Sequence, residues 1–338
     1  MNIIIDAYGG DLGPRAAIDG ALMAMNERSD IEITLSGDEE KLGAEIAAAG
    51  AQGRFSILHA PFVIDGHDDP TSVVKNKPDS SMMTGLRALS EGRGDAFISA
   101  GNTGALFAGG TLIVKRLAGV KRGALAPLLP AKDGPFMLID AGANIVCTPQ
   151  MLMQFAVMGS IYMRMVKGIE NPRVGLLNVG AEDTKGTELQ LEAYKLLSEA
   201  DINFIGNIEG RDVPYSGADV VVTDGFTGNV ALKLYEGLAK VLMGSVKDVF
   251  MSGTKAKLGA MMVKDSFTDL KKRYDYKEVG GTAFLGIKKP VFKTHGSSDA
   301  RTFYSTIINV SDYVKADVTN EIRKGIEASD GERKKPSI

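Results

Sequence analysis

The chain has 338 residues, of which 44% are hydrophobic and 24% are charged, and its formal net charge is -3. This length allows two domains or one large α/β domain, and a mildly acidic chain without a basic stripe is not expected to bind nucleic acid. The single cysteine, Cys147, excludes an internal disulfide framework and is typical of a reducing cytoplasm. The sequence shows neither a signal-peptide pattern nor an apolar run of about 20 residues, so we expect a cytoplasmic protein.

Short apolar runs alternate with helical patterns along most of the chain. Pro14 stands where a helix over 16–25 is expected to begin, and Ser80 is placed to cap a later helix. Strands are expected at 2–6, 31–36, 55–60, 96–100, 136–140, 174–178, 203–206 and 218–223. The other helices are expected at 41–49, 151–166, 187–199 and 230–250. Apolar strands separated by helices predict a doubly wound, mainly parallel sheet that is covered on both faces.

No linker divides the sequence, so we expect one continuous α/β domain over 1–328 and a flexible polar tail at 329–338. Within the domain, segment 232–276 breaks the alternation and has the pattern of two amphipathic helices joined near Gly253. Residues 251–275 hold six Lys or Arg and three Asp. A basic helical hairpin can lie on an anionic membrane surface, or it can pack against a second subunit. Both interpretations remain open, and they are compatible.

Two glycine turns follow predicted strands and lead directly into helical patterns. The first contains Gly101, Asn102, Thr103 and Gly104. The second contains Asp224, Gly225, Phe226, Thr227, Gly228 and Asn229. Glycines permit close backbone approach, and a helix start offers unpaired N–H groups and a positive dipole end, so such turns can bind phosphate. An ordinary βα turn with a polar cap has the same pattern, but two such turns suggest that both contribute to one polar site surface.

Other polar residues are expected at the same edge of the sheet, because ligands in parallel sheets bind beyond the carboxyl ends of the strands. They are Asn144, Asn178, Lys185, Asn207 and His295. Lys185 can act as a point charge for phosphate, or it can pair with Glu182 on a first helical turn. His295 can act as a general acid or anion donor, or it can be a capping or core histidine.

Several common functional patterns are missing from the sequence. There is no G-x-G-x-x-G fingerprint, no Walker pattern and no G-x-S-x-G elbow, which disfavours a dehydrogenase, an NTPase and an acyl-serine enzyme. The three histidines, His59, His67 and His295, are scattered and have no helical partner at metal-ligand spacing. We therefore expect neither a cofactor nor a metal site.

The sequence resembles the bacterial phosphate acyltransferase family (PlsX, acyl-ACP:phosphate transacylases). The matching blocks lie at 5–11, 99–105, 140–144, 174–185, 203–211, 219–232, 280–281 and 295–298. They extend from the first strand to about residue 312, and in combination they are far more specific than one glycine turn. Two departures are small: Tyr8 stands where the family commonly has methionine, and the run at 282–285 differs. Neither departure touches a polar group of the expected site.

The resemblance implies an enzyme that moves a fatty acyl group from acyl carrier protein to inorganic phosphate. Its acyl phosphate would then be used by a membrane glycerol-3-phosphate acyltransferase in phospholipid biosynthesis. The resemblance also implies a Rossmann-like fold similar to phosphotransacetylases and isocitrate-type dehydrogenases, a homodimer, and peripheral membrane association, which favours a membrane role for the hairpin at 232–276. A CoA-dependent phosphotransacetylase is the alternative from the same fold.

Phosphate is itself a nucleophile, so this chemistry needs oriented donors rather than a covalent catalyst. We expect phosphate to bind the turn from Gly101 to Gly104, with Lys185 and His295 balancing its charge. Either Asn229 or Asn144 would donate to the thioester oxygen, and Asp224 would orient these donors. The remaining expected substrate-binding residues are Asn178, Asn207, Thr227 and Gly228.

Overall fold

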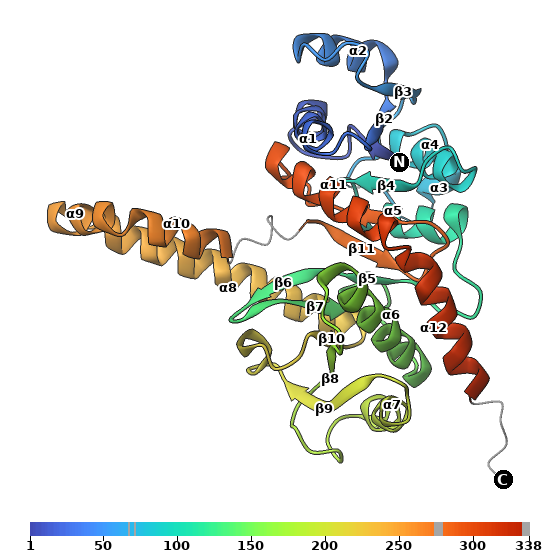
Figure 1. Ribbon diagram of the computed structural model, residues 1–338, viewed down its shortest axis with the longest axis vertical. Coiled ribbons are helices and arrows are strands. Elements are labelled where there is room, and N and C mark those ends of the chain that lie inside the picture. Colours follow the sequence, from blue (N-terminus) through green and yellow to red (C-terminus); the bar gives the residue numbers. More distant parts are fainter. Residues whose placement is uncertain (67, 71, 274–279, 333–338) are drawn as a thin grey trace.

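The strands form two sheets in the computed structural model, which describes residues 1–66, 68–70, 72–273 and 280–332 (Figure 1). The first sheet has seven strands in the order β3-β2-β1-β4-β12-β11-β5, and the second has five in the order β6-β7-β10-β8-β9. The first comprises β1 (Asn2–Asp6), β2 (Glu32–Gly37), β3 (Ser56–His59), β4 (Ala96–Ser99), β5 (Ala124–Ala126), β11 (Thr282–Leu285) and β12 (Val291–Lys293). The second comprises β6 (Leu128–Ala131), β7 (Gly134–Ile139), β8 (Arg173–Asn178), β9 (Asn203–Glu209) and β10 (Val220–Val222).

Most neighbouring strands are parallel, which confirms the predicted α/β class. Strands β3, β2, β1, β4 and β12 pair in parallel, and so do β7, β10, β8 and β9. Strand β11 is antiparallel to both of its neighbours, and β6 is antiparallel to β7. Only Pro127 separates β5 from β6, so this stretch connects the two sheets. The alternating pattern could not show this division, because strands of both sheets have the same apolar signature.

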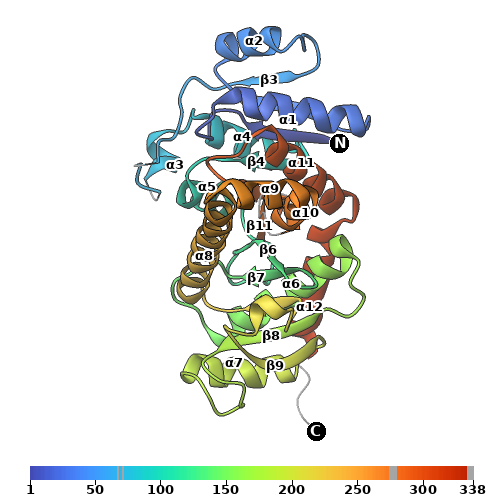
Figure 2. The same cartoon turned by 90° about the vertical axis from the view of Figure 1, so that its left-hand side faces the viewer.

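Helices cover both sheets (Figures 1 and 2). They are α1 (Pro14–Glu27), α2 (Glu39–Ala48), α3 (Val73–Asn76), α4 (Ser81–Ser90), α5 (Thr103–Gly109), α6 (Pro149–Lys167), α7 (Glu188–Ser198), α11 (Ala300–Lys315) and α12 (Val318–Glu332). A π-helical turn, Gly110–Val114, extends α5, and a 3-10 turn lies at Val213–Tyr215. The expected starts are confirmed, because α1 begins at Pro14 and the Ser80 hydroxyl accepts from the N–H of Met83.

Helix α6 is the central core element. Its side chains are buried on nearly all sides from Met151 to Met163, as expected of a helix that is hydrophobic all round. It packs against α7, α12 and strand β10. Thr148 caps its first turn, and Gly168 ends it in the left-handed conformation that glycine adopts without strain. The loop that precedes α6 is thereby held at the carboxyl end of β7, where the candidate site lies.

A helical hairpin projects from the second sheet, formed by α8 (Gly225–Met251), α9 (Thr254–Met262) and α10 (Lys264–Arg273) (Figure 1). The predicted joint near Gly253 is confirmed, but the second predicted helix divides into α9 and α10. Of the α8 residues, only Gly225 and Gly228 are buried. A ring contact between Phe250 and Phe267 holds α10 against α8. No helix in the described part of the chain is both long and apolar enough to cross a bilayer.

Two expected segments extend beyond the described residues. The hairpin was expected to reach residue 276, but positions 274–276 lie outside the described residues. His67 also lies outside them. Of the expected flexible tail, residues 329–332 belong to helix α12, and 333–338 lie outside the described residues.

Candidate active site

A cleft of about 700 Å³ lies between the two sheets, where loops of the first sheet face helix α8 and strand β7 of the second. One part of its lining is polar and comprises Thr103, Gly104, Asn229, Lys233, Glu236, Lys293, Thr294, His295 and Thr302. The rest is largely apolar and includes Phe107, Leu125, Pro127, Leu128, Leu129, Ala141, Ile145 and Leu232. Four of the predicted site residues therefore meet here from opposite walls: Thr103, Gly104, Asn229 and His295.

The first glycine turn is built by hydrogen bonds beneath it. Asn102 caps α5, since its Oδ1 accepts from the N–H of Ala105 at 3.0 Å. The N–H of Gly101 donates to the Ser99 hydroxyl oxygen at 3.0 Å, so it is already engaged. Helix geometry leaves the N–H groups of Thr103 and Gly104 without a carbonyl partner in their own helix. Both residues line the cleft, so the second half of this turn presents its N–H groups there.

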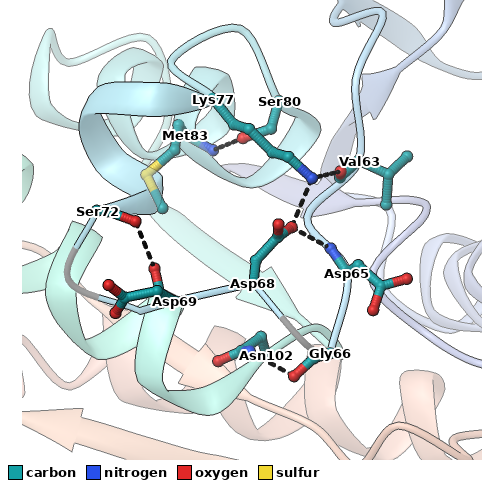
Figure 3. A network of polar contacts seen from close by, with 10 residues as sticks. All are labelled: Val63, Asp65, Gly66, Asp68, Asp69, Ser72, Lys77, Ser80, Met83 and Asn102. Carbon is teal, nitrogen blue, oxygen red and sulfur yellow. Dashed lines mark hydrogen bonds and ion pairs between the residues drawn. The ribbon is translucent and has the colours of Figure 1, made fainter.

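A loop after β3 covers this turn. Figure 3 shows that the Asn102 amide donates to the carbonyl of Gly66, at 3.2 Å, while Lys77 forms an ion pair with Asp68 at 2.6 Å. Pro70 of the same loop lines the cleft, and a Cβ at Gly104 would lie 2.6 Å from its ring. A side chain at position 104 would therefore push the loop away from the site.

Asp140 organises the turn after β7 from a fully buried position. Its Oδ1 accepts from the N–H groups of Leu125, Gly142 and Ala143, and its Oδ2 accepts from the backbone and side-chain nitrogens of Asn144 at 2.7 and 2.9 Å. Burial raises the pKa of Asp140, and these donors act in the opposite direction. The carboxylate is therefore a structural acceptor that shapes the turn from which Ala141, Gly142 and Ala143 line the cleft.

The same bonds distinguish the surroundings of Asn144 and Asn229, the two residues expected to donate to the thioester oxygen. The amide nitrogen of Asn144 donates to Asp140 and, at 2.8 Å, to the carbonyl of Gly123, so both of its hydrogens serve the turn. Asn229 is exposed and lines the cleft, with its side chain over Gly142. The geometry favours Asn229.

The second glycine turn starts helix α8. Asp224 caps it, because its two carboxylate oxygens accept from the N–H and the hydroxyl of Thr227 at 2.9 and 2.8 Å. The N–H of Gly225 donates to the carbonyl of Asn144, and a Cβ at Gly228 would overlap the carbonyl oxygen of Asp140. This turn and the Asp140 turn therefore interlock, and together they set the position of Asn229.

Lys293 is the last residue of β12, and His295 lies two residues after it. The Nδ1 atom of His295 accepts from the N–H of Ser297 at 3.1 Å, so the neutral ring carries its proton on Nε2. The Lys293 ammonium donates to the carbonyl of Ala100 at 3.1 Å and to that of Thr294. The sequence pattern did not single out Lys293, although a lysine that ends the apolar run Val291-Phe292 at a strand's carboxyl end is a usable signal.

Asn178 is the last residue of β8, Asn207 lies within β9, and Lys185 lies in the loop between β8 and α7. All three are outside the lining of the cleft. The Asn178 amide donates to the carbonyl of Lys185 at 3.0 Å, and the Asn207 amide donates to that of Glu182 at 2.7 Å. These asparagines therefore anchor the loop at 179–187, and the side chain of Lys185 is exposed. Its contact with phosphate stays a prediction.

That contact is tested by Lys185→Ala. If Lys185 binds phosphate, KM for phosphate rises about tenfold or more, the equivalent of about 1.4 kcal/mol of lost binding. The protein should remain folded, because the side chain is exposed. Steady-state rates at varied phosphate measure the effect, with Lys195→Ala on α7 as the control. An unchanged KM would remove Lys185 from the site and leave Lys233 and Lys293 as the lysines on the described lining of the cleft.

Comparison with solved structures identifies the class of fold. A phosphotransacetylase from Streptococcus pyogenes superposes with a TM-score of 0.63 at 16% sequence identity, covering 93% of this chain and 94% of that one. The chain therefore has the Rossmann-like α/β fold of phosphotransacetylases, as expected.

Sequence comparison identifies the family. Residues 1–321 match the family model described as fatty acid synthesis protein. The chain is 46% identical over 328 residues to a phosphate acyltransferase of Bacillus licheniformis, covering 97% of this chain and 98% of that protein. It is 48% identical to a phosphate acyltransferase of Bacillus pumilus with the same two coverages. The chain belongs to the phosphate acyltransferase family, and it is a transferase enzyme.

Proposed function

We propose that this enzyme transfers a fatty acyl group from acyl carrier protein to inorganic phosphate, which forms an acyl phosphate. The observation that carries the proposal is the mixed lining of the cleft, in which the start of helix α5 and His295 meet apolar walls that include Phe107, Leu128 and Leu232. The start of helix α5 suits a phosphate dianion, because helix N-termini bind anions. The apolar walls suit an acyl chain, which gains free energy by leaving water.

The reaction follows from this arrangement. A phosphate oxygen attacks the thioester carbon, so a C–O bond forms while the carbonyl oxygen becomes an oxyanion. Asn229, which lines the cleft, donates to that oxyanion. The C–S bond then breaks, and the electron pair leaves with sulfur as a thiolate. The Nε2–H of His295 stabilises the developing charge on the oxyanion or on the departing sulfur. Asp224 orients these groups by fixing the first turn of α8.

The apolar extent of the cleft also favours a long-chain donor over the short acyl group of a CoA-dependent phosphotransacetylase. The test is a comparison of a long-chain acyl thioester of acyl carrier protein with the same acyl-CoA, each with and without phosphate. We expect acyl phosphate, trapped as the hydroxamate, from the carrier-protein thioester at the higher kcat/KM and only with phosphate. A higher kcat/KM for acyl-CoA would support the alternative function, and turnover independent of phosphate would contradict both.

The helical hairpin supports two further parts of the proposal. Leu234, Leu238 and Leu242 of α8 are all exposed and are spaced four residues apart, so they form one apolar stripe. We assign this stripe to the contact of a homodimer. The end of the hairpin carries exposed Met261 and Met262 on α9, the element farthest from the sheets in Figure 1. With the lysines of α9 nearby, this end suits an anionic membrane surface, where acyl phosphate can pass to a membrane glycerol-3-phosphate acyltransferase.

The membrane contact is tested by the double substitution Met261→Glu and Met262→Glu. The two side chains are 74% and 84% exposed, so the fold should tolerate the change. We expect co-sedimentation with vesicles containing phosphatidylglycerol to fall by about fivefold or more, because two inserted apolar groups are lost and two negative charges are added. The control is Met23→Glu, a 40% exposed methionine on α1. Equal sedimentation of the double variant and the native protein would contradict the membrane contact.

A further inference from the structure

A buried chain of polar groups lies beneath the first glycine turn. Asp6, at the carboxyl end of β1, is 1% exposed, and its Oδ2 accepts from the Ser99 hydroxyl at 2.7 Å. The Ser99 oxygen in turn accepts from the N–H of Gly101 at 3.0 Å. A Cβ at Gly9 would lie 2.6 Å from both Asp6 Oδ2 and the Gly101 nitrogen, so glycine lets the β1 loop close over this chain. Asp6 therefore fixes the Gly101 turn through a neighbouring strand.

Lys293 holds the same turn from the other side. Strand β12 pairs with β4, and Lys293 lies opposite Ser99 in that register. Its ammonium donates to the carbonyl of Ala100, immediately before Gly101, and to that of Thr294. An ammonium has three N–H donors, so these two bonds leave one for a ligand in the cleft that Lys293 lines.

The other lysine on the cleft lining is differently placed. Lys233 of α8 forms an ion pair with Glu236 at 2.9 Å, and both residues line the opposite wall. Its charge is thereby balanced within the protein. Lys293 instead shares its wall with Thr103, Gly104 and His295, which the proposed function assigns to phosphate and to the reacting thioester.

We propose that Lys293 is the cation that binds the phosphate dianion in this cleft, and that Asp6 is a positioning residue that sets the Gly101 turn. The inference rests on the proposed function, since it names the phosphate ligand of the same site. A charge-assisted bond from a partly desolvated ammonium binds phosphate more strongly than a neutral donor does. It also adds to the positive dipole end of α5 on the same anion.

The surroundings of Lys293 give this role a pH dependence. Burial lowers the pKa of Lys293 to about 8, and the carboxylates of Asp6 on β1 and Asp11 in the following loop act in the opposite direction. Lys233 on α8 faces it as a like charge and lowers the pKa further. The cation is therefore present below about pH 8 and lost above it, so KM for phosphate should rise on the alkaline side. Asp6→Asn removes a carboxylate that supports the cation, so this rise should begin at lower pH.

The experiment compares Lys293→Met, Lys293→Arg and the control Lys288→Met in acyl phosphate synthesis at varied phosphate. Lys288 precedes the same strand at its other end and is exposed. We expect Lys293→Met to raise KM for phosphate by about ten- to a hundredfold, the scale of a hydrogen bond to a charged group. Lys293→Arg keeps a positive charge, so its KM for phosphate should increase less than that of Lys293→Met. The alkaline increase in KM should then begin at a higher pH than in the native protein. The KM of Lys288→Met for phosphate should stay within about twofold of the native value, because surface substitutions commonly have small effects.

The outcomes separate this inference from the proposed function. Native protein that shows no phosphate-dependent turnover would contradict both. Native turnover with a Lys293→Met KM within about twofold of the native value would overturn the role of Lys293 alone. Should Lys293→Met fail to fold, as judged by circular dichroism, the native pH profile decides. A phosphate KM that stays flat above about pH 8, or a rise that Asp6→Asn does not displace, would then overturn the proposal.

Discussion

Replacing His295 by alanine is expected to lower kcat by about a hundredfold or more, the usual scale for one general acid or oxyanion donor. The N–H of Ser297 donates to Nδ1 of the ring, so the neutral imidazole carries its proton on Nε2. The side chain is exposed at the cleft, so its removal should leave the fold intact. Single-turnover rates at saturating phosphate and acyl donor measure the effect on the chemical step.

A matched substitution, His59→Ala, controls for the loss of an imidazole. His59 ends β3, and its Nδ1 accepts from the N–H of Glu39 at 3.3 Å, in the same manner as His295 accepts from Ser297. It does not line the cleft, so kcat should stay within about twofold, as surface substitutions commonly leave function unchanged. Near-native turnover of His295→Ala would refute the role of His295.

The largest loss of stability is expected from Asp140→Ala. The substitution leaves the N–H groups of Leu125, Ala143 and Asn144 without their acceptor inside the protein. Each unpaired buried donor costs about 1–3 kcal/mol, and relaxation of the structure recovers part of this cost. We therefore expect the free energy of unfolding to fall by about 3–5 kcal/mol. Urea unfolding monitored by circular dichroism measures the difference.

Two other substitutions serve as comparisons for the loss of stability in Asp140→Ala. Asp140→Asn keeps an acceptor at Oδ1 but presents an amide where Asn144 donates, so its loss should be intermediate. Asp133→Ala, on the exposed turn between β6 and β7, should change stability by no more than about 0.5 kcal/mol. A loss below about 1 kcal/mol for Asp140→Ala would show that the five donors do not depend on this carboxylate.

Local features of the fold were predictable because local chemistry decides them. Pro14 begins α1, Asn102 and Asp224 cap the helices that follow the two glycine turns, and the hairpin bends at Gly253. Each of these depends on residues within a few positions of one another. The division into two sheets was not predictable, because it depends on which distant strands pair. Strands β5, β6 and β11 are short, and a three- or four-residue run carries little periodicity.

The candidate site shows the same limit. A strand-end asparagine looks alike in sequence whether it faces a ligand or holds a turn, and the structure shows that Asn144 holds a turn whereas Asn229 faces the cleft. The position of Lys293 at the end of an apolar run was a usable signal, but its contact with Ala100 depends on the pairing of β12 with β4, which no local pattern shows. Lys185 precedes a helix with a suitable motif, yet its loop lies outside the lining of the cleft.

The central claim is that phosphate held in the cleft between the sheets is the direct acceptor of the acyl group. It is tested most directly by supplying inorganic phosphate uniformly labelled with oxygen-18 and following both thiol release and the product by mass spectrometry. We expect one acyl phosphate for each thiol released, with every phosphorus-bound oxygen labelled, including the oxygen that bridges to the acyl carbon. Thiol release at the same rate without phosphate, with free fatty acid as the product, would contradict the claim.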